Sequence, residues 1–161
     1  MNFSLENALK VVGEKFNVSH LSEIQDGRYV INTPNFEVNL EEAASSGSIF
    51  FYAKIGEAPE QPGIDFYSRL LEANFFARET AGASLGVDSA SQTILLFLRI
   101  SVLELSPHNF EERLLNFMDA VDYWVRVVDT YLDAVEEPAV QLFQRRSSAT
   151  VWQSRQRLAV G

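Results

Sequence analysis

The sequence predicts an α+β domain, a twisted antiparallel sheet with helices packed on one side. Apolar residues recur at helical spacing over 4–17, 65–79 and 107–135, whereas 28–55 and 93–100 contain the alternating or continuous apolar runs of strands. The strands come in runs and do not alternate singly with helices, which is typical of α+β domains. The predicted order is helix-strand-strand-strand-helix-strand-strand-helix.

Length and charge favour one main domain followed by an oppositely charged tail. At 161 residues the chain can bury a core without disulfides, and it has no cysteine for a disulfide or a thiolate metal site. The first 137 residues hold 22 acidic and 9 basic residues, a net charge of −13, whereas the last 24 hold four arginines and no acid. We therefore expect a single domain over 1–137 and a basic tail over 138–161, partly helical or disordered.

The charge and the apolar runs also argue against nucleic-acid binding, a membrane span and secretion through a signal peptide. An acidic body repels phosphate backbones, which argues against nucleic acid. No apolar run reaches the roughly 18 residues of a membrane span, and the first residues lack the basic-then-apolar layout of a signal peptide. No glycine loop is followed by Lys-Ser or Lys-Thr, so no phosphate-binding loop is visible and we expect no cofactor.

The first predicted helix, residues 4–17, is amphipathic. Ser4 can cap its first turn. One stripe of the helix carries the apolar residues Leu5, Ala8, Leu9, Val12 and Phe16.

Three strands are expected between residues 28 and 55. A turn signal precedes Arg28–Asn32, and Asn35–Leu40 alternates apolar and polar residues as a half-buried strand does. In Ile49–Ile55, Phe50 and Tyr52 lie on the face opposite to the other apolar residues. A strand with large apolar side chains on both faces must be covered on both faces.

The helix predicted over 65–79 carries two apolar stripes. The first contains Phe66, Leu70, Ala73 and Ala77, and the second contains Tyr67, Leu71 and Phe75 with Asn74 beside it. A surface helix of a monomer needs only one such stripe, so the second predicts packing against another chain.

The last third of the chain repeats this excess of apolar surface. In residues 93–100, Leu95 and Phe97 lie opposite to the other apolar side chains. Ser106 can cap the next helix, with Pro107 at its first position. We expect this long helix to end at Glu136-Glu137-Pro138, because proline disrupts a helix interior.

One sequence motif resembles the nucleophile motif of hydrolases, but its predicted context does not fit, so we expect no catalytic residues and no enzyme. Gly82-Ala83-Ser84-Leu85-Gly86 matches the G-x-S-x-G nucleophile motif, and His108 follows it. That motif needs a strand before the serine and a helix after it, whereas here a helix pattern precedes Ser84 and a strand pattern follows. His20 and His108 are the only histidines and form no zinc-binding pair, so no metal site is expected.

The segment 70–88 carries a family resemblance. Leu70-Leu71-Glu72-Ala73-Asn74-Phe75, followed by Thr80-Ala81-Gly82-Ala83-Ser84-Leu85-Gly86-Val87-Asp88, resembles the class I type III secretion chaperones, the Tir-chaperone family. The apolar strand and the helix with Phe110, Phe117 and a late Trp124 extend the resemblance over residues 4–130. Ala81 and Ala83 flank a single glycine where the family often has a glycine pair, and the tail after Pro138 has no counterpart.

The resemblance implies a small acidic homodimer in the bacterial cytoplasm. Such chaperones hold the N-terminal segment of a secreted effector protein in an extended form for export, without ATP. The resemblance leaves open whether the tail contacts the export ATPase, and how many effectors are bound. An added strand at a sheet edge and apolar pockets would bind the effector, and two copies would meet in an isologous contact.

These expectations define two predicted surfaces. The partner-binding surface comprises Leu9, Val12, Phe16, Ile31, Phe36, Phe50 and Tyr52. The dimer interface comprises Leu71, Asn74, Phe75, Leu95 and Phe97. The division between them depends on strand register, since a one-residue error inverts the faces of a strand.

Two other readings stay open. One is a small serine hydrolase that uses Ser84, and the other is a homodimeric scaffold for a folded partner. A chaperone protects an unstructured effector segment from protease, whereas a scaffold binds a folded domain equally well.

Overall fold

The structure is a computed structural model that describes residues 3–16, 21–25, 27–43, 45–60 and 63–157. The chain divides into two compact units, Met1–Arg126 and Val127–Gly161. The elements are α1 (Leu5–Phe16), β1 (Leu21–Gln25), β2 (Arg28–Asn32), β3 (Glu37–Ala43), β4 (Ser48–Glu57), α2 (Ile64–Asn74), the 3₁₀ turn η1 (Phe75–Ala77), β5 (Ser84–Asp88), β6 (Thr93–Ser101), the 3₁₀ turn η2 (Val102–Glu104) and α3 (Pro107–Arg157).

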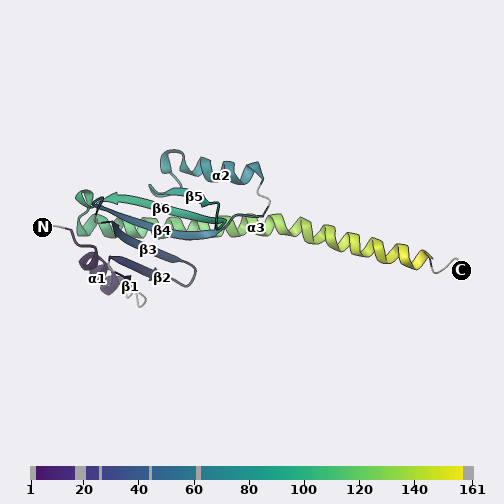
Figure 1. Cartoon of the computed structure of the whole chain (residues 1–161), viewed down its shortest axis with the longest axis horizontal. Coiled ribbons are helices and arrows are strands. Elements are labelled where there is room, and N and C mark those ends of the chain that lie inside the picture. The colour runs from purple at the N-terminus through teal and green to yellow at the C-terminus, as the bar shows by residue number, and fades with distance from the viewer. Residues whose placement is uncertain (1–2, 17–20, 26, 44, 61–62, 158–161) are drawn as a thin grey trace. The chain divides into compact units, whose positions relative to one another are not determined.

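The predicted α+β class is confirmed, with one strand more than expected. The strands form one antiparallel sheet in the order β1-β2-β3-β4-β6-β5 (Figure 1). In the part of the chain that the structure describes, four strands and not three precede α2, and the added one is β1. Its sequence, Leu-Ser-Glu-Ile-Gln, is too short and polar for alternation alone to separate it from a turn.

The inner face of the sheet forms the core of the first unit. Pairing between the strands places on this face the buried residues Tyr29, Ile31, Val38, Leu40, Ile49, Phe51, Ala53, Ile94, Leu96, Leu98 and Ile100. The first turns of α3 cover it. The rings of Phe110 and Phe117 meet the ring of Phe51 edge-on, with centroids 5.8 and 5.7 Å away. These contacts fix α3 across β4, since edge-to-face aromatic pairs add to the burial energy.

The starts of α1 and α3 are capped as the sequence predicts. In α1, the Asn7 N–H donates to Ser4 Oγ at 3.4 Å. In α3, the Asn109 N–H donates to Ser106 Oγ at 3.3 Å, and the Ser106 N–H donates to Asn109 Oδ1 at 2.7 Å. This reciprocal pair satisfies backbone donors that the first helical turn leaves free.

The predicted helix 65–79 is shorter in the structure. Regular α-helix ends at Asn74, and the next two turns are irregular because Phe76, Ala77 and Ala81 have positive φ angles of 55, 50 and 53°. Left-handed backbone is disfavoured for residues with a Cβ, so the sequence gives no sign of it. Figure 1 shows α2 along the β5 side of the sheet, and the two elements are in contact.

The prediction that the last helix ends at Pro138 is wrong. The described helix α3 continues through Pro138 to Arg157. A proline inside a helix removes one backbone hydrogen bond and usually bends the helix without always ending it. The assignment of 138–161 as a separate basic tail stays a prediction.

Candidate partner-binding surfaces

The outer face of the sheet brings together residues from both predicted surfaces. Strand pairing places Tyr52 opposite Phe97, and Lys54 opposite Leu95. Phe50 lies on the same face, two residues before Tyr52. Phe50, Tyr52 and Leu95 are half-buried, and 44% of Phe97 is exposed. We call these four residues the outer apolar patch.

A glycine makes room for the most exposed residue of this patch. A Cβ added at Gly86 would lie 3.3 Å from Cε1 of Phe97. The ring of Phe97 therefore lies across β5 where a larger residue would push it away. Gly86 does not have a left-handed φ, so its function is this close approach and not a turn.

Basic side chains border the outer apolar patch. The Arg28 guanidinium donates to the hydroxyl of Tyr52 at 3.0 Å and pairs with the Glu41 carboxylate at 3.3 Å. Arg99 Nε donates to Ser48 Oγ at 3.0 Å on the other side of Phe50. Hydrogen bonds hold Tyr52 and Arg99 in place, so the patch is an ordered surface with apolar groups at its centre and charges at its margin. That arrangement is typical of protein-binding surfaces.

A second apolar surface lies on α2 and the turn after it. Leu71 and Phe75, both assigned to the dimer interface from the sequence, are 69% and 70% exposed. Two further exposed apolar residues of this surface were not predicted. Ile64 lies about two helical turns before Leu71, and Phe76 is 74% exposed. Ile64 shares the helical spacing of the stripe and could have been found. Phe76 turns outward because of its positive φ, which the sequence does not reveal.

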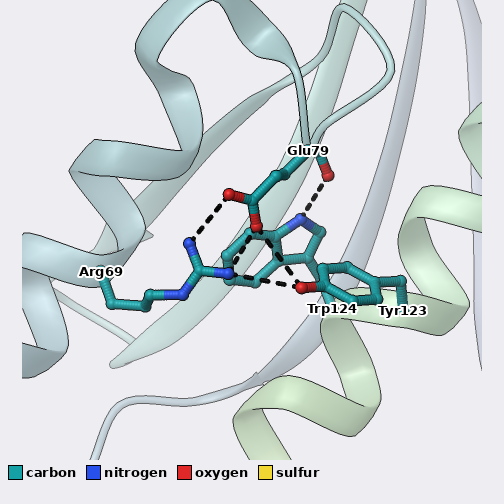
Figure 2. Close-up of polar contacts among 4 residues, drawn as sticks. All are labelled: Arg69, Glu79, Tyr123 and Trp124. Atoms are coloured by element: carbon teal, nitrogen blue, oxygen red, sulfur yellow. Dashed lines mark hydrogen bonds and ion pairs between the residues drawn. The ribbon is translucent and has the colours of Figure 1, made fainter.

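A polar cluster holds the turn after α2 against α3 (Figure 2). The Arg69 guanidinium donates to both carboxylate oxygens of Glu79 and lies 5.0 Å from the ring centre of Trp124. The indole N–H of Trp124 donates to the backbone carbonyl of Glu79 at 2.8 Å. Tyr123 completes the cluster through its hydroxyl. Hydrogen bonding to Arg69 lowers the pKa of Glu79. The cluster thereby positions the strained turn that exposes Phe76.

Three residues assigned to the partner surface are instead core residues. Leu9, Val12 and Ile31 are buried in the chain itself. An amphipathic stripe marks a covered face but does not say what covers it, which is why the sequence could not separate these cases. Phe36 is half-buried, and the side chain of Phe16 lies outside the described residues. A partner surface on α1 would have to use other side chains.

One such side chain is Val11, which lines an open groove. The groove has a volume of about 560 Å³ and lies between α1 and the segment that leads into α3. Its walls are Phe3, Ser4, Asn7, Ala8, Val11, Leu105, Ser106 and Pro107. More than half of Val11 is exposed. The groove is wide enough for a large apolar side chain of another protein.

The residues of the enzyme motif do not form a nucleophile elbow. Ser84 is the first residue of β5 and lies opposite Phe97, and β5 leads into β6, not into a helix. His108 is exposed in the first turn of α3. Among the described residues, no group of three or more His, Cys, Asp or Glu side chains could hold a metal ion. In the same part of the chain, no helix is both long and apolar enough to cross a membrane.

Solved structures share this fold at low sequence identity. The HopA1–SchA chaperone–effector complex matches with a TM-score of 0.60 and 16% identity, covering 75% of this chain and 92% of that one. The heterodimeric ExoU–SpcU complex from the type III secretion system of Pseudomonas aeruginosa matches with a TM-score of 0.58 and 16% identity, covering 78% and 96%. YbjN, a putative transcription regulator from E. coli, matches with 0.62 and 9% identity, covering 82% and 96%.

These structural matches have low sequence identity, so the family is assigned from the sequence. No curated protein matches the chain. The profile of the Tir chaperone protein (CesT) family matches residues 7–125, which include the six strands that the structure describes and most of the first compact unit. That match covers well over half of the 161 residues. The chain therefore belongs to the Tir chaperone protein (CesT) family.

Proposed function

We propose that this protein is a type III secretion chaperone of the bacterial cytoplasm. It binds the N-terminal segment of one or more effector proteins, keeps that segment extended and presents it for export without ATP. The observation that carries the proposal is the outer apolar patch, an ordered apolar surface exposed on a domain of the Tir chaperone protein family.

Two features of the structure support binding of an extended segment. The sheet ends in β1, and a terminal strand can accept a further strand through its backbone groups. Phe50 and Tyr52 of the outer apolar patch offer an apolar surface, and the Val11 groove offers a pocket, and both can bind large side chains of that segment. An unstructured segment loses conformational entropy on binding, so several such contacts are needed for useful affinity.

The same proposal includes a homodimer. Leu71, Phe75 and Phe76 on the α2 side and Phe97 on β6 are exposed, and Leu95 on β6 is half-buried. Clustered apolar side chains that stay exposed mark interaction sites. A two-fold symmetric contact would bury each of these side chains against the second copy. Phe97 and Tyr52 are directly paired, so we expect the dimer and effector surfaces to adjoin each other.

Copurification tests the proposed function. The full-length chain, isolated from the cytosol of its own bacterium, should carry a stoichiometric protein identified by mass spectrometry. Limited proteolysis should leave the N-terminal segment of that protein intact only in the complex. The variant Tyr52→Asp should lose the partner, whereas Asn116→Asp, which adds the same charge on an exposed part of α3, should retain it.

Two results would contradict the proposal. Equal binding to an isolated folded domain of the partner would favour a scaffold. Reaction of Ser84 with an acyl-serine probe, and loss of activity in Ser84→Ala, would favour a hydrolase. We expect Ser84→Ala to bind the partner as the wild type does, because its hydroxyl takes no part in the proposed contacts.

A further inference from the structure

The two terminal strands of the sheet, β1 and β5, differ in how their outer edges are covered. In an antiparallel strand, the N–H and C=O of alternate residues point away from the neighbouring strand. Such groups on a terminal strand attract additional strands. On β5 the alternate residues that point outward are Leu85 and Val87, preceded by Ala83 just before the strand.

Asn74 occupies both outward groups of Leu85. The Leu85 N–H donates to Asn74 Oδ1 at 2.8 Å, and Asn74 Nδ2 donates to the Leu85 carbonyl at 3.1 Å. One carboxamide therefore makes the same donor and acceptor pair that a residue of an adjoining strand would make. Asn74 is the last residue of α2, so the end of this helix lies against the edge of β5.

Thr80 occupies both outward groups of Ala83. The Ala83 N–H donates to the Thr80 carbonyl at 2.9 Å, and Thr80 Oγ1 donates to the Ala83 carbonyl at 2.7 Å. Thr80 is fully buried, so no water competes with this bond. Two successive outward positions of the edge are thus filled by the chain itself, and the next outward position along β5 is Val87.

We propose that Asn74 and Thr80 determine which edge of the sheet accepts an added strand. By filling the outward groups of Leu85 and Ala83 they close β5 against a strand from a second copy or from a partner. The second part of the proposal rests on the proposed function: an extended effector segment adds at β1, the other terminal strand. Residues 70–88, which carry the family resemblance, would thus determine which edge of the sheet can accept a strand.

Amide hydrogen exchange and particle size test the first part on the full-length chain alone. In Asn74→Ala the Leu85 amide loses its acceptor, so we expect its exchange to become about tenfold faster. In the double variant Asn74→Ala, Thr80→Val both groups of Leu85 and the carbonyl of Ala83 lose their side-chain partners, while the Ala83 N–H keeps the backbone carbonyl of residue 80. The edge is then open at Leu85, and sedimentation should show assemblies larger than those of the wild type that grow with concentration. Unchanged Leu85 exchange and unchanged size would overturn the proposal.

Two matched variants separate an open edge from mere destabilisation. Phe117→Leu weakens the core but leaves Asn74 and Thr80 in place, so it should keep the wild-type size. Asn74→Asp retains an acceptor for the Leu85 N–H and adds a charge that repels an incoming strand, so it should protect Leu85 and also keep the wild-type size. Larger assemblies in Phe117→Leu would overturn the proposal, as would larger assemblies in Asn74→Asp.

The second part is tested on the complex obtained by copurification. Amides of β1 should gain protection from exchange when the partner binds, and amides of β5 should not. Protection gained at β5 instead would overturn this part. If no partner is found, the proposed function fails, whereas the result for β5 in the isolated chain is unaffected.

Discussion

The same strands form both faces of the sheet, but the inner face is buried under α3 and the outer face stays partly exposed. On β4, Phe51 points inward, is fully buried and contacts two phenylalanines of α3. Its neighbours Phe50 and Tyr52 point outward and stay half exposed. Strand alternation alone would place polar residues on an outer face that contacts only water. The aromatic residues there are more than the fold of one chain requires.

This difference separates two kinds of apolar residue. Inner-face residues contribute to the stability of the chain, because they lose contact with water as it folds. Outer-face residues are expected to contribute mainly when another protein covers them. Substitutions on the two faces should therefore change different measured quantities.

The largest effect is expected on the inner face. Phe117→Ala removes a fully buried ring that packs on Phe51, and should lower the free energy of unfolding by about 3–5 kcal/mol. Phe50→Ala, on the outer face of the same sheet, should lower it by about 1 kcal/mol or less. Urea unfolding at low protein concentration measures both values. Equal losses would show that the two faces do not differ in this way.

The next effect concerns association between copies. Phe97→Asp places a charge in the outer apolar patch, and we expect the dissociation constant of the dimer to rise about 30-fold or more. Sedimentation equilibrium measures it. Leu103→Asp is the control, because Leu103 is 97% exposed and lies outside the proposed interface. A wild type that stays monomeric at every concentration would contradict the homodimer.

The sequence correctly predicted which side chains share a face of a strand or helix. It did not predict whether the chain itself or another protein covers that face. Alternation in Ile49–Ile55 correctly separated Phe50 and Tyr52 from the core, and the second stripe of α2 correctly marked Leu71 and Phe75 as apolar residues outside it. The stripe of α1 carried the same signal, yet Leu9 and Val12 are buried within the chain. Periodicity identifies a covered face, whereas the covering element depends on contacts far apart in sequence.

The remaining errors have local physical causes. The exposure of Phe76 depends on a left-handed φ that phenylalanine rarely adopts, and only the surrounding contacts stabilise it. The continuation of α3 through Pro138 contradicts the usual preference of proline. The double hydrogen bond of Asn74 to Leu85 requires the helix end and the strand edge to meet, which no pattern within either segment encodes.

A smaller change at Gly86 tests whether the outer apolar patch acts through the position of Phe97. In Gly86→Ala the new Cβ lies 3.3 Å from the Phe97 ring, and the ring must move by a few tenths of an ångström. Because Phe97 is partly exposed it can turn away, so the free energy of unfolding should change by less than about 1 kcal/mol. Dimer affinity should fall about threefold to tenfold.

The control for this variant is Ser84→Ala, which lies opposite Phe97 without adding an atom against its ring. It should change neither the free energy of unfolding nor the dimer affinity. Wild-type dimer affinity in Gly86→Ala would contradict a function for the ring position. Sedimentation and urea unfolding together make this distinction.

The Arg69–Glu79 pair predicts a small pH dependence. Arg69 lowers the pKa of Glu79 in the folded chain, so the pair stabilises the fold fully above the unfolded pKa of Glu79. This stabilisation is lost as the pH falls through the lower, folded pKa. Both side chains are more than a third exposed, so the difference between wild type and Glu79→Gln at pH 7 should be below about 1 kcal/mol.

Thermal unfolding from pH 7 down to pH 3 checks this sign. The difference in free energy of unfolding between wild type and Glu79→Gln should be constant down to about pH 5 and shrink below it. Glu72→Gln, an exposed carboxylate on α2, serves as the control. A difference that grows as the pH falls would contradict the assignment.

The smallest effect is expected where the turn after α2 is strained. Ala81 has a φ of 53°, which disfavours any residue with a Cβ, and glycine removes that penalty. Part of the gain is offset, because glycine also gives the unfolded chain more conformations. We expect Ala81→Gly to raise the free energy of unfolding by about 0.5 kcal/mol, measured by urea unfolding.

Ala90→Gly, at a turn residue without a positive φ, should lower it instead. Stabilisation by both variants, or by neither, would show that the backbone of Ala81 is not strained.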